Sequence, residues 1–350
     1  MSHHKIFILY TGGTIGMAPS DIKDPHSPLV PKNWEQLSYF MPSIKPGGYF
    51  SQRGISFHYH SFPEPLDSSQ ITPEHWIKIS NILYESYDDY DGFIIIHGTD
   101  TMAYSASMLS FFFNGLTKPI VFTGSQLPIS HSRTDAINNF SNSIHIAASE
   151  VFGLPTVPEV SICFNDRLLR GNRSSKLSTR DFEGFESPNY GHLAQLEEHI
   201  VIHSRRIREI SQPHMKPTLM NKLDTRVLDL SLFPGLSSDT LRRLLGEDEL
   251  DGLILRTYGA GNAPMNADFL KTLKDASVSG TLILNITQCF HGGVDMQKYR
   301  AGKTLLENGV VSGRDLTKEA ALTKMMWVLG NFEGEDRIKA LCTDQRGEMS

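Results

Sequence analysis

The sequence feature that most constrains the fold is the short apolar run Ile6–Leu9, which is followed almost at once by residues 11–14 (TGGT). A run of this length suits a buried strand and is too short for a helix. The two glycines permit positive φ angles and a close approach of the backbone to another segment. We therefore predict a strand that ends in a polar turn, the place where open parallel sheets bind ligands. The alternative is a turn whose threonine hydroxyls only cap the backbone.

The same pattern recurs at Phe93–Ile96, an apolar run that leads into residues 97–100 (HGTD) and a predicted helix over Thr101–Phe113. An aspartate at a helix start is commonly a cap. The threonine that precedes Asp100 in a second glycine-containing strand end favours a functional role instead. His97 is a candidate base, although a histidine at the end of an apolar strand is more often structural.

Further strands are predicted at Ile55–His60, Pro119–Pro128 and Glu159–Phe164, and helices at about 73–87 and 135–150. The segment Ala18–Asn33 contains four prolines and lacks periodicity, which predicts a loop that acts either as a lid or as an ordinary surface excursion. The segment Phe62–Thr72 reads as a second loop.

Strand and helix patterns alternate again after residue 224, which predicts a second parallel α/β unit. At 350 residues the chain exceeds the size of most single cores. We predict a larger N-terminal parallel-sheet domain at 1–204, a linker at 205–224 that contains Pro213 and Pro217, and a smaller C-terminal α/β domain at 225–350. The second domain is predicted to hold strands at 227–232, 252–255 and 281–286 and helices at 238–244, 266–276 and 318–329.

Composition limits the partners. The formal net charge of −6, without long runs of one sign, argues against nucleic acid. No apolar run is long enough to span a bilayer, and no leader pattern is recognisable, so we expect a cytoplasmic protein. Three cysteines, Cys163, Cys289 and Cys342, have spacings that suit neither zinc nor a disulfide framework. The phosphate-loop and GxGxxG spacings are also missing, and we expect no cofactor and no metal.

Once metal and cofactor sites are set aside, the candidate catalytic groups are threonine hydroxyls, one carboxylate and one lysine. A threonine hydroxyl is a weak nucleophile that needs a base. Lys176 ends the basic segment at 165–176, and a lysine beside a carboxylate and a hydroxyl can accept a proton if its pKa is lowered. Thr14, Asp100 and Lys176 therefore fit acyl transfer best, with glycine-turn amides as oxyanion donors. Spacing alone does not show that these residues touch.

Five motifs in this order resemble the bacterial-type L-asparaginases, and most closely their cytoplasmic type I branch. The likeness covers nearly the whole chain. It implies intimate dimers that usually pair into tetramers. The motifs are TGGTIGM at 11–17, HGTDTMAYSASMLSF at 97–111, FTGSQLP at 122–128, NDRLLRGNRSSK at 165–176 and YGAGNAP at 258–264.

The resemblance assigns roles to individual residues. Thr14 matches the nucleophile that attacks the side-chain amide of asparagine, and Thr99, Asp100 and Lys176 match the groups that handle protons. A further set matches the substrate-holding residues: Asp67, Ser68, Ser69, and Asn262 from a neighbouring subunit. As a turn former, the segment 67–69 has an ordinary structural alternative.

Two features depart from the family pattern or extend it. Many members carry a lid tyrosine, whereas this chain has Pro28 or Leu29 at the matching place. Some type I enzymes also bind asparagine at a regulatory site. The matching residues here are Ser175, Arg256, Thr287 and Cys289, with Ser175 in place of a threonine.

Three functions therefore remain in view. The leading hypothesis is hydrolysis of L-asparagine. The second hypothesis is a glutaminase or a mixed glutaminase-asparaginase. Glutamine is longer than asparagine by one methylene, and a pocket discriminates such substrates by only about 1–3 kcal/mol of binding free energy. A non-catalytic amino-acid sensor would have kept the binding residues after losing its lid tyrosine. The joint presence of Thr14, Thr99, Asp100 and Lys176 argues against the sensor.

Overall fold

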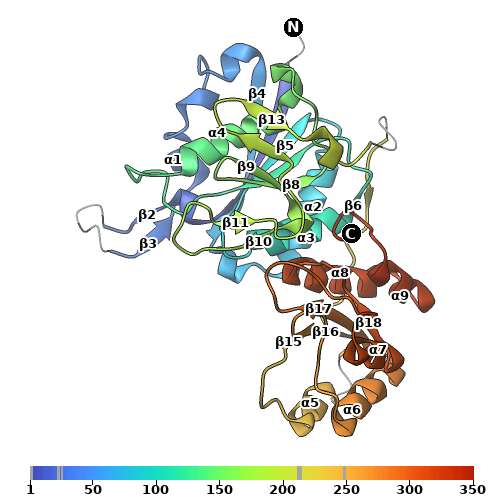
Figure 1. Cartoon of the computed structure of the whole chain (residues 1–350). Helices are drawn as coiled ribbons and strands as arrows, with labels where there is room; N and C mark the ends of the chain where they lie inside the picture. Colours follow the sequence, from blue (N-terminus) through green and yellow to red (C-terminus); the bar gives the residue numbers. More distant parts are fainter. Residues whose placement is uncertain (1–2, 22–23, 25–26, 211–214, 247–249) are drawn as a thin grey trace. The chain divides into compact units, whose positions relative to one another are not determined.

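The computed structural model describes residues 3–21, 24, 27–210, 215–246 and 250–350, and the chain forms two compact units (Figure 1). The first unit comprises Met1–Ser187 and Gly191–Leu219, and the second comprises Pro188–Tyr190 and Met220–Ser350. The linker at 205–224 and the domain bounds on either side of it stay predictions. Residues 211–214 of that linker lie outside the described residues.

The first unit is built on one mixed sheet in the order β13-β12-β9-β8-β7-β5-β1-β4. Strands β4, β1, β5, β7 and β8 are parallel, while β9, β12 and β13 extend the sheet antiparallel. The predicted parallel sheet is therefore correct for its larger part. The strands are β1 (His4–Gly12), β4 (Ile55–Leu66), β5 (Gly92–Ile96), β7 (Ile120–Thr123), β8 (Val160–Phe164), β9 (Arg167–Arg170), β12 (Ala194–Leu196) and β13 (Ile200–Ile202).

The strand order identifies the place on this sheet where a ligand site is expected. The chain runs from β1 to β4 on one side, and then crosses β1 to place β5, β7 and β8 on the other side. The order therefore reverses between β1 and β5. In open α/β sheets such a reversal leaves a crevice at the carboxyl ends of the two strands, and ligands bind there. The TGGT and HGTD turns follow these same two strands.

The core of this unit surrounds β5, which is apolar and buried along its whole length, and helices pack over the sheet. Helix α4 (Ala136–Ala147) contacts β5, β7 and β8, while α3 (Met102–Phe112) contacts β8 and α2 (Pro73–Glu85). Helix α2 has Thr72 as its N-cap and Pro73 at its first position, a residue that suits this position because its missing N–H would have no partner there.

Two strand predictions need correction. The segment Phe62–Thr72 is not wholly a loop, because β4 continues to Leu66. Its prolines are tolerated since β4 is the edge strand and pairs only with β1. The sequence reading also missed the β8–β9 hairpin, whose turn holds Asn165 and Asp166 at positive φ angles of 46° and 58°.

The candidate lid segment Ala18–Asn33 contains parts of two short paired strands, β2 (Met17–Pro19) and β3 (Leu29–Pro31). Residues 22, 23, 25 and 26 lie outside the described residues. The other short elements of this unit are α1 (Trp34–Ser38), β6 (Phe113–Asn114), β10 (Ser175–Lys176), β11 (Phe185–Glu186) and β14 (Thr218–Leu219).

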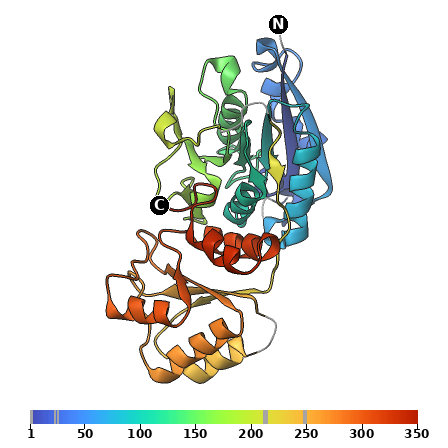
Figure 2. The same cartoon turned by 90° about the vertical axis from the view of Figure 1, so that its right-hand side faces the viewer.

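The second unit has a four-stranded parallel sheet in chain order, as the alternating pattern predicted. Helices α5 and α6 lie on one face of this sheet and α8 on the other (Figures 1 and 2). The fourth strand and helices α7 and α9 were not predicted. The elements are β15 (Val227–Ser231), α5 (Ser238–Leu245), β16 (Gly252–Thr257), α6 (Ala267–Val278), β17 (Leu282–Thr287), α7 (Arg300–Glu307), β18 (Val310–Ser312), α8 (Lys318–Asn331) and α9 (Glu335–Cys342).

A buried ion pair fastens the last residues of the chain to α8. The Lys324 ammonium lies 2.6 Å from the Glu348 carboxylate, and neither side chain is exposed. Lys324 also donates to the Thr343 carbonyl, while Glu348 accepts from the backbone amides of Gln345 and Arg346. Such a pair is compatible with the interior because both charges are hydrogen-bonded. Among the described residues, no helix is long and apolar enough to cross a membrane.

Candidate active site

The turn after β1 lies against the turn after β5 through backbone contact. Gly12 and Gly13 have φ angles of 128° and 94°, which L side chains rarely adopt. A Cβ atom on Gly13 would collide with the backbone of Gly98, and one on Gly12 would collide with the backbone of Leu66. The expected close approach is therefore confirmed, and it brings three strand ends together.

The two threonine hydroxyls of the first turn have different environments. Thr11 is buried and donates to the Ile96 carbonyl of β5 at 2.9 Å, so its hydroxyl only ties two strands together. The Thr14 hydroxyl makes no hydrogen bond with any described residue. Thr14 begins the short 3₁₀ turn Thr14–Gly16, one residue beyond the contact between Gly13 and Gly98. Of the two hydroxyls, that of Thr14 is free to react.

Thr99, Asp100 and Lys176 come together although they are far apart in sequence. The Lys176 Nζ donates to Thr99 Oγ1 at 2.9 Å and to Asp100 Oδ1 at 2.5 Å. Thr99 is buried, whereas the Asp100 side chain is 62% exposed and that of Lys176 is 17% exposed. The helix-cap alternative for Asp100 is wrong, since the N-cap of α3 is Thr101 and no side chain caps it. The three groups form a chain from a buried hydroxyl to solvent.

Lys176 is held in place by the segment that precedes it. Its strand β10 pairs with β11, with Lys176 opposite Phe185. Upstream, the Arg170 guanidinium pairs with the Glu159 carboxylate at 2.6 Å, and both side chains are almost completely buried. Ser174 donates to the Arg170 carbonyl at 2.6 Å. The basic segment is therefore mainly structural, and Lys176 is its member that meets the polar turns.

The segment 67–69 borders the same edge of the sheet. The Thr101 hydroxyl donates to the Ser68 carbonyl at 2.7 Å, and a Cβ atom on Gly98 would lie 2.6 Å from Ser68 Oγ. Asp67 Oδ1 accepts from the Ser69 amide at 2.8 Å, as in an ordinary turn. Asp67 and Ser69 are exposed, and Ser68 is buried. The structure thus places all three beside the turn that carries Thr99.

His97 belongs to the scaffold of this site. Its Nδ1–H donates to the Gly98 carbonyl at 2.7 Å, and its Nε2 lies 2.9 Å from Ser105 Oγ. Ser105 in turn accepts from the Trp76 indole at 2.9 Å. Complete burial lowers the pKa of His97 to about 4, so the ring is neutral near pH 7. With both ring nitrogens engaged, the structural interpretation of this histidine holds.

The resemblance assigns Asn262 to the site of a neighbouring subunit and four residues to a regulatory site. All of these except Ser175 lie in the second unit. Asn262 closes a tight turn through paired backbone bonds with Tyr258. The Arg256 guanidinium pairs with Asp229 at 2.7 Å, and the Thr287 hydroxyl donates to Gly259 and accepts from the Cys289 amide. Ser175 belongs to the first unit and is buried.

Sequence reasoning missed the side chains that lock the turns together. Thr11 and Thr101 do so through the bonds described above, and Asp135 accepts from the amides of Gln126 and Leu127 in the turn after β7. The signal available for Thr11 and Thr101 was their place beside glycine-containing strand ends. Asp135 stands directly before α4, nine residues beyond Gln126, and had no such signal. Within the described residues, no group of three or more histidine, cysteine or acidic side chains is arranged to hold a metal ion.

Two family models match the chain. The model described as "Asparaginase, N-terminal" matches residues 5–208, and the "Glutaminase/Asparaginase C-terminal domain" model matches residues 226–341. Together they span most of the sequence.

Individual proteins agree with these models. The chain is 38% identical to L-asparaginase 1 of Escherichia coli (strain K12), and the match covers 100% of this chain and 99% of that protein. Among solved structures, L-asparaginase I of Vibrio cholerae superposes with a TM-score of 0.87 at 35% identity over 100% of both chains. The thermostable L-asparaginase of Thermococcus kodakarensis gives a TM-score of 0.87 at 32% identity over 99% of both chains.

Proposed function

The chain belongs to the asparaginase family and is a hydrolase of amides, and we propose that its substrate is L-asparagine, which it converts to L-aspartate and ammonia. One observation supports this most directly. Lys176 contacts both Thr99 and Asp100 at the strand-order reversal, where the neighbouring turn presents the unengaged hydroxyl of Thr14. A nucleophile, a proton-handling group and glycine-turn amides are the parts that acyl transfer requires.

In the proposed reaction the Thr14 oxygen attacks the side-chain amide carbon of asparagine. A C–O bond forms, the C–N bond breaks, and the amide nitrogen leaves as ammonia with the proton from the Thr14 hydroxyl. Water then attacks the aspartyl ester, which releases L-aspartate and restores Thr14. Covalent catalysis of this kind replaces one difficult step by two easier ones.

Thr99, Lys176 and Asp100 handle the protons in this scheme. The Thr99 oxygen accepts from Lys176, which leaves the Thr99 hydroxyl proton free to face the attacking group. Asp100 holds the Lys176 amine from the solvent side. A proton therefore has a continuous route of hydrogen-bonded groups between Thr99 and solvent. The route requires no metal ion and no cofactor.

We assign substrate binding to Asp67, Ser68 and Ser69, with Thr99 and Asp100 beside them. Their carboxylate and hydroxyl groups match the α-amino and α-carboxylate groups of an amino acid. Asn262 lies in the other unit, and we propose that it completes the site of a neighbouring copy in a dimer or a tetramer. The three cysteines form no disulfide, in keeping with a reducing cytoplasm.

Ammonia release with L-asparagine and with L-glutamine, each over a wide concentration range, tests the proposal. We expect a higher kcat/KM for asparagine, because a pocket built for the shorter side chain strains the longer one. A higher value for glutamine would make the chain a glutaminase. Binding of asparagine without ammonia release would make it a sensor, and either result would overturn the assignment.

A further inference from the structure

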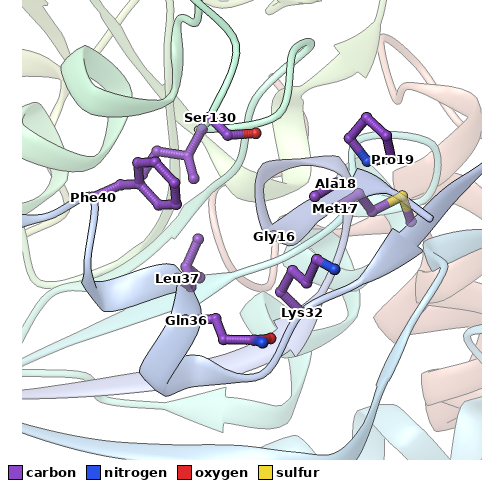
Figure 3. Close-up of a pocket in the computed structure, with 10 residues that line it drawn as sticks. Gly16, Met17, Ala18, Pro19, Lys32, Gln36, Leu37, Phe40 and Ser130 are labelled. Atoms are coloured by element: carbon purple, nitrogen blue, oxygen red, sulfur yellow. The ribbon is translucent and has the colours of Figure 1, made fainter. Parts of the chain in front are cut away.

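A cavity of about 420 Å³ lies beside the turn that carries Thr14 (Figure 3). Its volume is within the usual range of small-molecule sites. Phe40 and Leu37 lie on one side of it, and Met17 and Pro19 lie on the other (Figure 3). None of the residues assigned to asparagine binding or turnover lines it. The cavity is therefore separate from the site described above.

The lining is mainly apolar, and its polar members are Lys32, Ser130 and Gln36, whose side chain is engaged with Asn33. Leu37 and Ile129 are 1% and 5% exposed, whereas Phe40 keeps 39% of its surface open. Lys32 is the single charged residue among the described residues that line the cavity. Its ammonium makes no hydrogen bond or ion pair with any described residue, and neither does the Ser130 hydroxyl. An apolar chamber with an unengaged ammonium is complementary to an apolar molecule that carries one carboxylate.

The walls of the cavity are bonded to the two residues that follow Thr14. The Lys32 amide donates to the Gly16 carbonyl at 2.8 Å, and the Ile129 amide donates to the Ile15 carbonyl at 3.0 Å. The buried Tyr10 hydroxyl donates to the Lys32 carbonyl at 3.0 Å, and a Cβ atom on Gly16 would collide with that hydroxyl. A molecule in the cavity thus touches a tightly packed frame around the nucleophile turn.

We propose that this cavity is an effector site for an amphipathic monocarboxylate, whose apolar chain fills the cavity while its carboxylate pairs with Lys32. Occupation stiffens the frame around residues 14–16 and so changes turnover at Thr14. This effect on turnover rests on the proposed function, whereas binding does not.

Titration calorimetry on the full chain tests binding, with octanoate, decanoate and octan-1-ol as probes. We expect decanoate to bind roughly tenfold more tightly than octanoate, because two more methylenes are buried. Lys32→Met should weaken octanoate binding about fivefold and leave octan-1-ol unaffected, since an exposed ion pair contributes at most about that factor. Lys274→Met, which removes an exposed ammonium on α6 in the second unit, is the matched control. Ala18→Leu, which fills the cavity, should abolish binding of all three.

Octanoate that binds no better than octan-1-ol, or equally well to Lys32→Met, would overturn the site. Ammonia release from asparagine with and without decanoate tests the effector role. We expect kcat or KM to change in the unmodified protein and not in Ala18→Leu; binding without such a change would overturn that role. A protein without basal ammonia release would instead contradict the proposed function, and calorimetry alone would then decide whether the cavity binds the acid.

Discussion

Thr11 and Thr14 are two threonines of one turn with opposite environments, which makes them a matched pair for mutation. We expect Thr14→Ala to lose at least about 10³-fold in kcat with the fold intact, because groups of a nucleophilic site act as a unit. Thr11→Val removes the bond to the Ile96 carbonyl. It should cost about 1 kcal/mol of stability and retain the nucleophile. Ammonia release and urea unfolding measure both effects, and near-normal turnover in folded Thr14→Ala would refute the nucleophile assignment.

The buried ring of His97 predicts a pH dependence of stability. Its pKa falls from 6.5 to about 4 in the folded chain, so below pH 6.5 the unfolded chain binds a proton that the folded chain does not. The contribution of neutral His97 to the free energy of unfolding is therefore fully present above pH 6.5. It is lost as the pH falls towards 4, and the total loss is about 3 kcal/mol.

His97→Gln removes this titration and isolates its effect. The difference in unfolding free energy between the unmodified chain and the variant should shrink by that amount between pH 7 and pH 4, as followed by urea denaturation. Burial also lowers the pKa of the half-buried His145 and His192, but these are present in both proteins and cancel. A difference that stays constant with pH would show that His97 does not titrate as its burial implies.

At the scale of elements, the site depends on two turns whose backbones touch. Gly13→Ala should lower kcat about 100-fold, because the added methyl group forces the Gly98 turn away and small displacements of reacting groups are costly. Gly47→Ala is the matched control, since Gly47 also has a positive φ, of 81°, but an added methyl group meets nothing within 4 Å. Both variants also introduce backbone strain, which for Gly13 at φ 94° and ψ 170° is on the order of 1–3 kcal/mol. Equal kcat values would contradict the role of the contact.

The elements that sequence predicted well are those whose signal is local. Both β1 and β5 are contiguous apolar runs, and α2 has a cap and a proline at its first position. The extension of β4 was missed because its prolines read as breakers, and only its edge position makes them harmless. Strands such as β12 and β18 have three residues each, too few for a periodic pattern.

The sequence suggests candidate members of the site but carries no information on their contacts. Thr14, Thr99 and Lys176 stand out as polar groups beside glycine-rich strand ends, and the family resemblance assigns their roles. Lys176 lies 77 residues from Thr99 in sequence, and the segment that leads to it contains Arg170, which forms a buried pair with Glu159. No spacing rule carries that information, since it arises from the packing of the whole unit.

At the scale of the whole molecule, the residues matched to a regulatory site are divided between the two units. We propose that asparagine bound by Ser175, Arg256, Thr287 and Cys289 makes the rate curve of the assembled enzyme sigmoidal. Cooperativity requires unequal binding to two conformations, typically by about 1–3 kcal/mol. Within the chain, however, Arg256 already pairs with Asp229, whose burial raises the pKa of that carboxyl. The Arg256 guanidinium therefore has two candidate partners, the carboxylate of the effector and the carboxylate of Asp229.

Two variants distinguish the effects of these two interactions of Arg256. Arg256→Ala removes both, and should give a hyperbolic curve with the saturating rate retained. Asp229→Asn keeps the guanidinium and removes its charged partner, so the curve should stay sigmoidal and its midpoint should move to lower asparagine concentration, because the fork is then free to take a carboxylate. Initial ammonia release over a wide asparagine range measures both curves. A hyperbolic curve for Asp229→Asn would mean that the ion pair itself carries the effect, and a hyperbolic curve for the unmodified enzyme would mean that this second site does not regulate it.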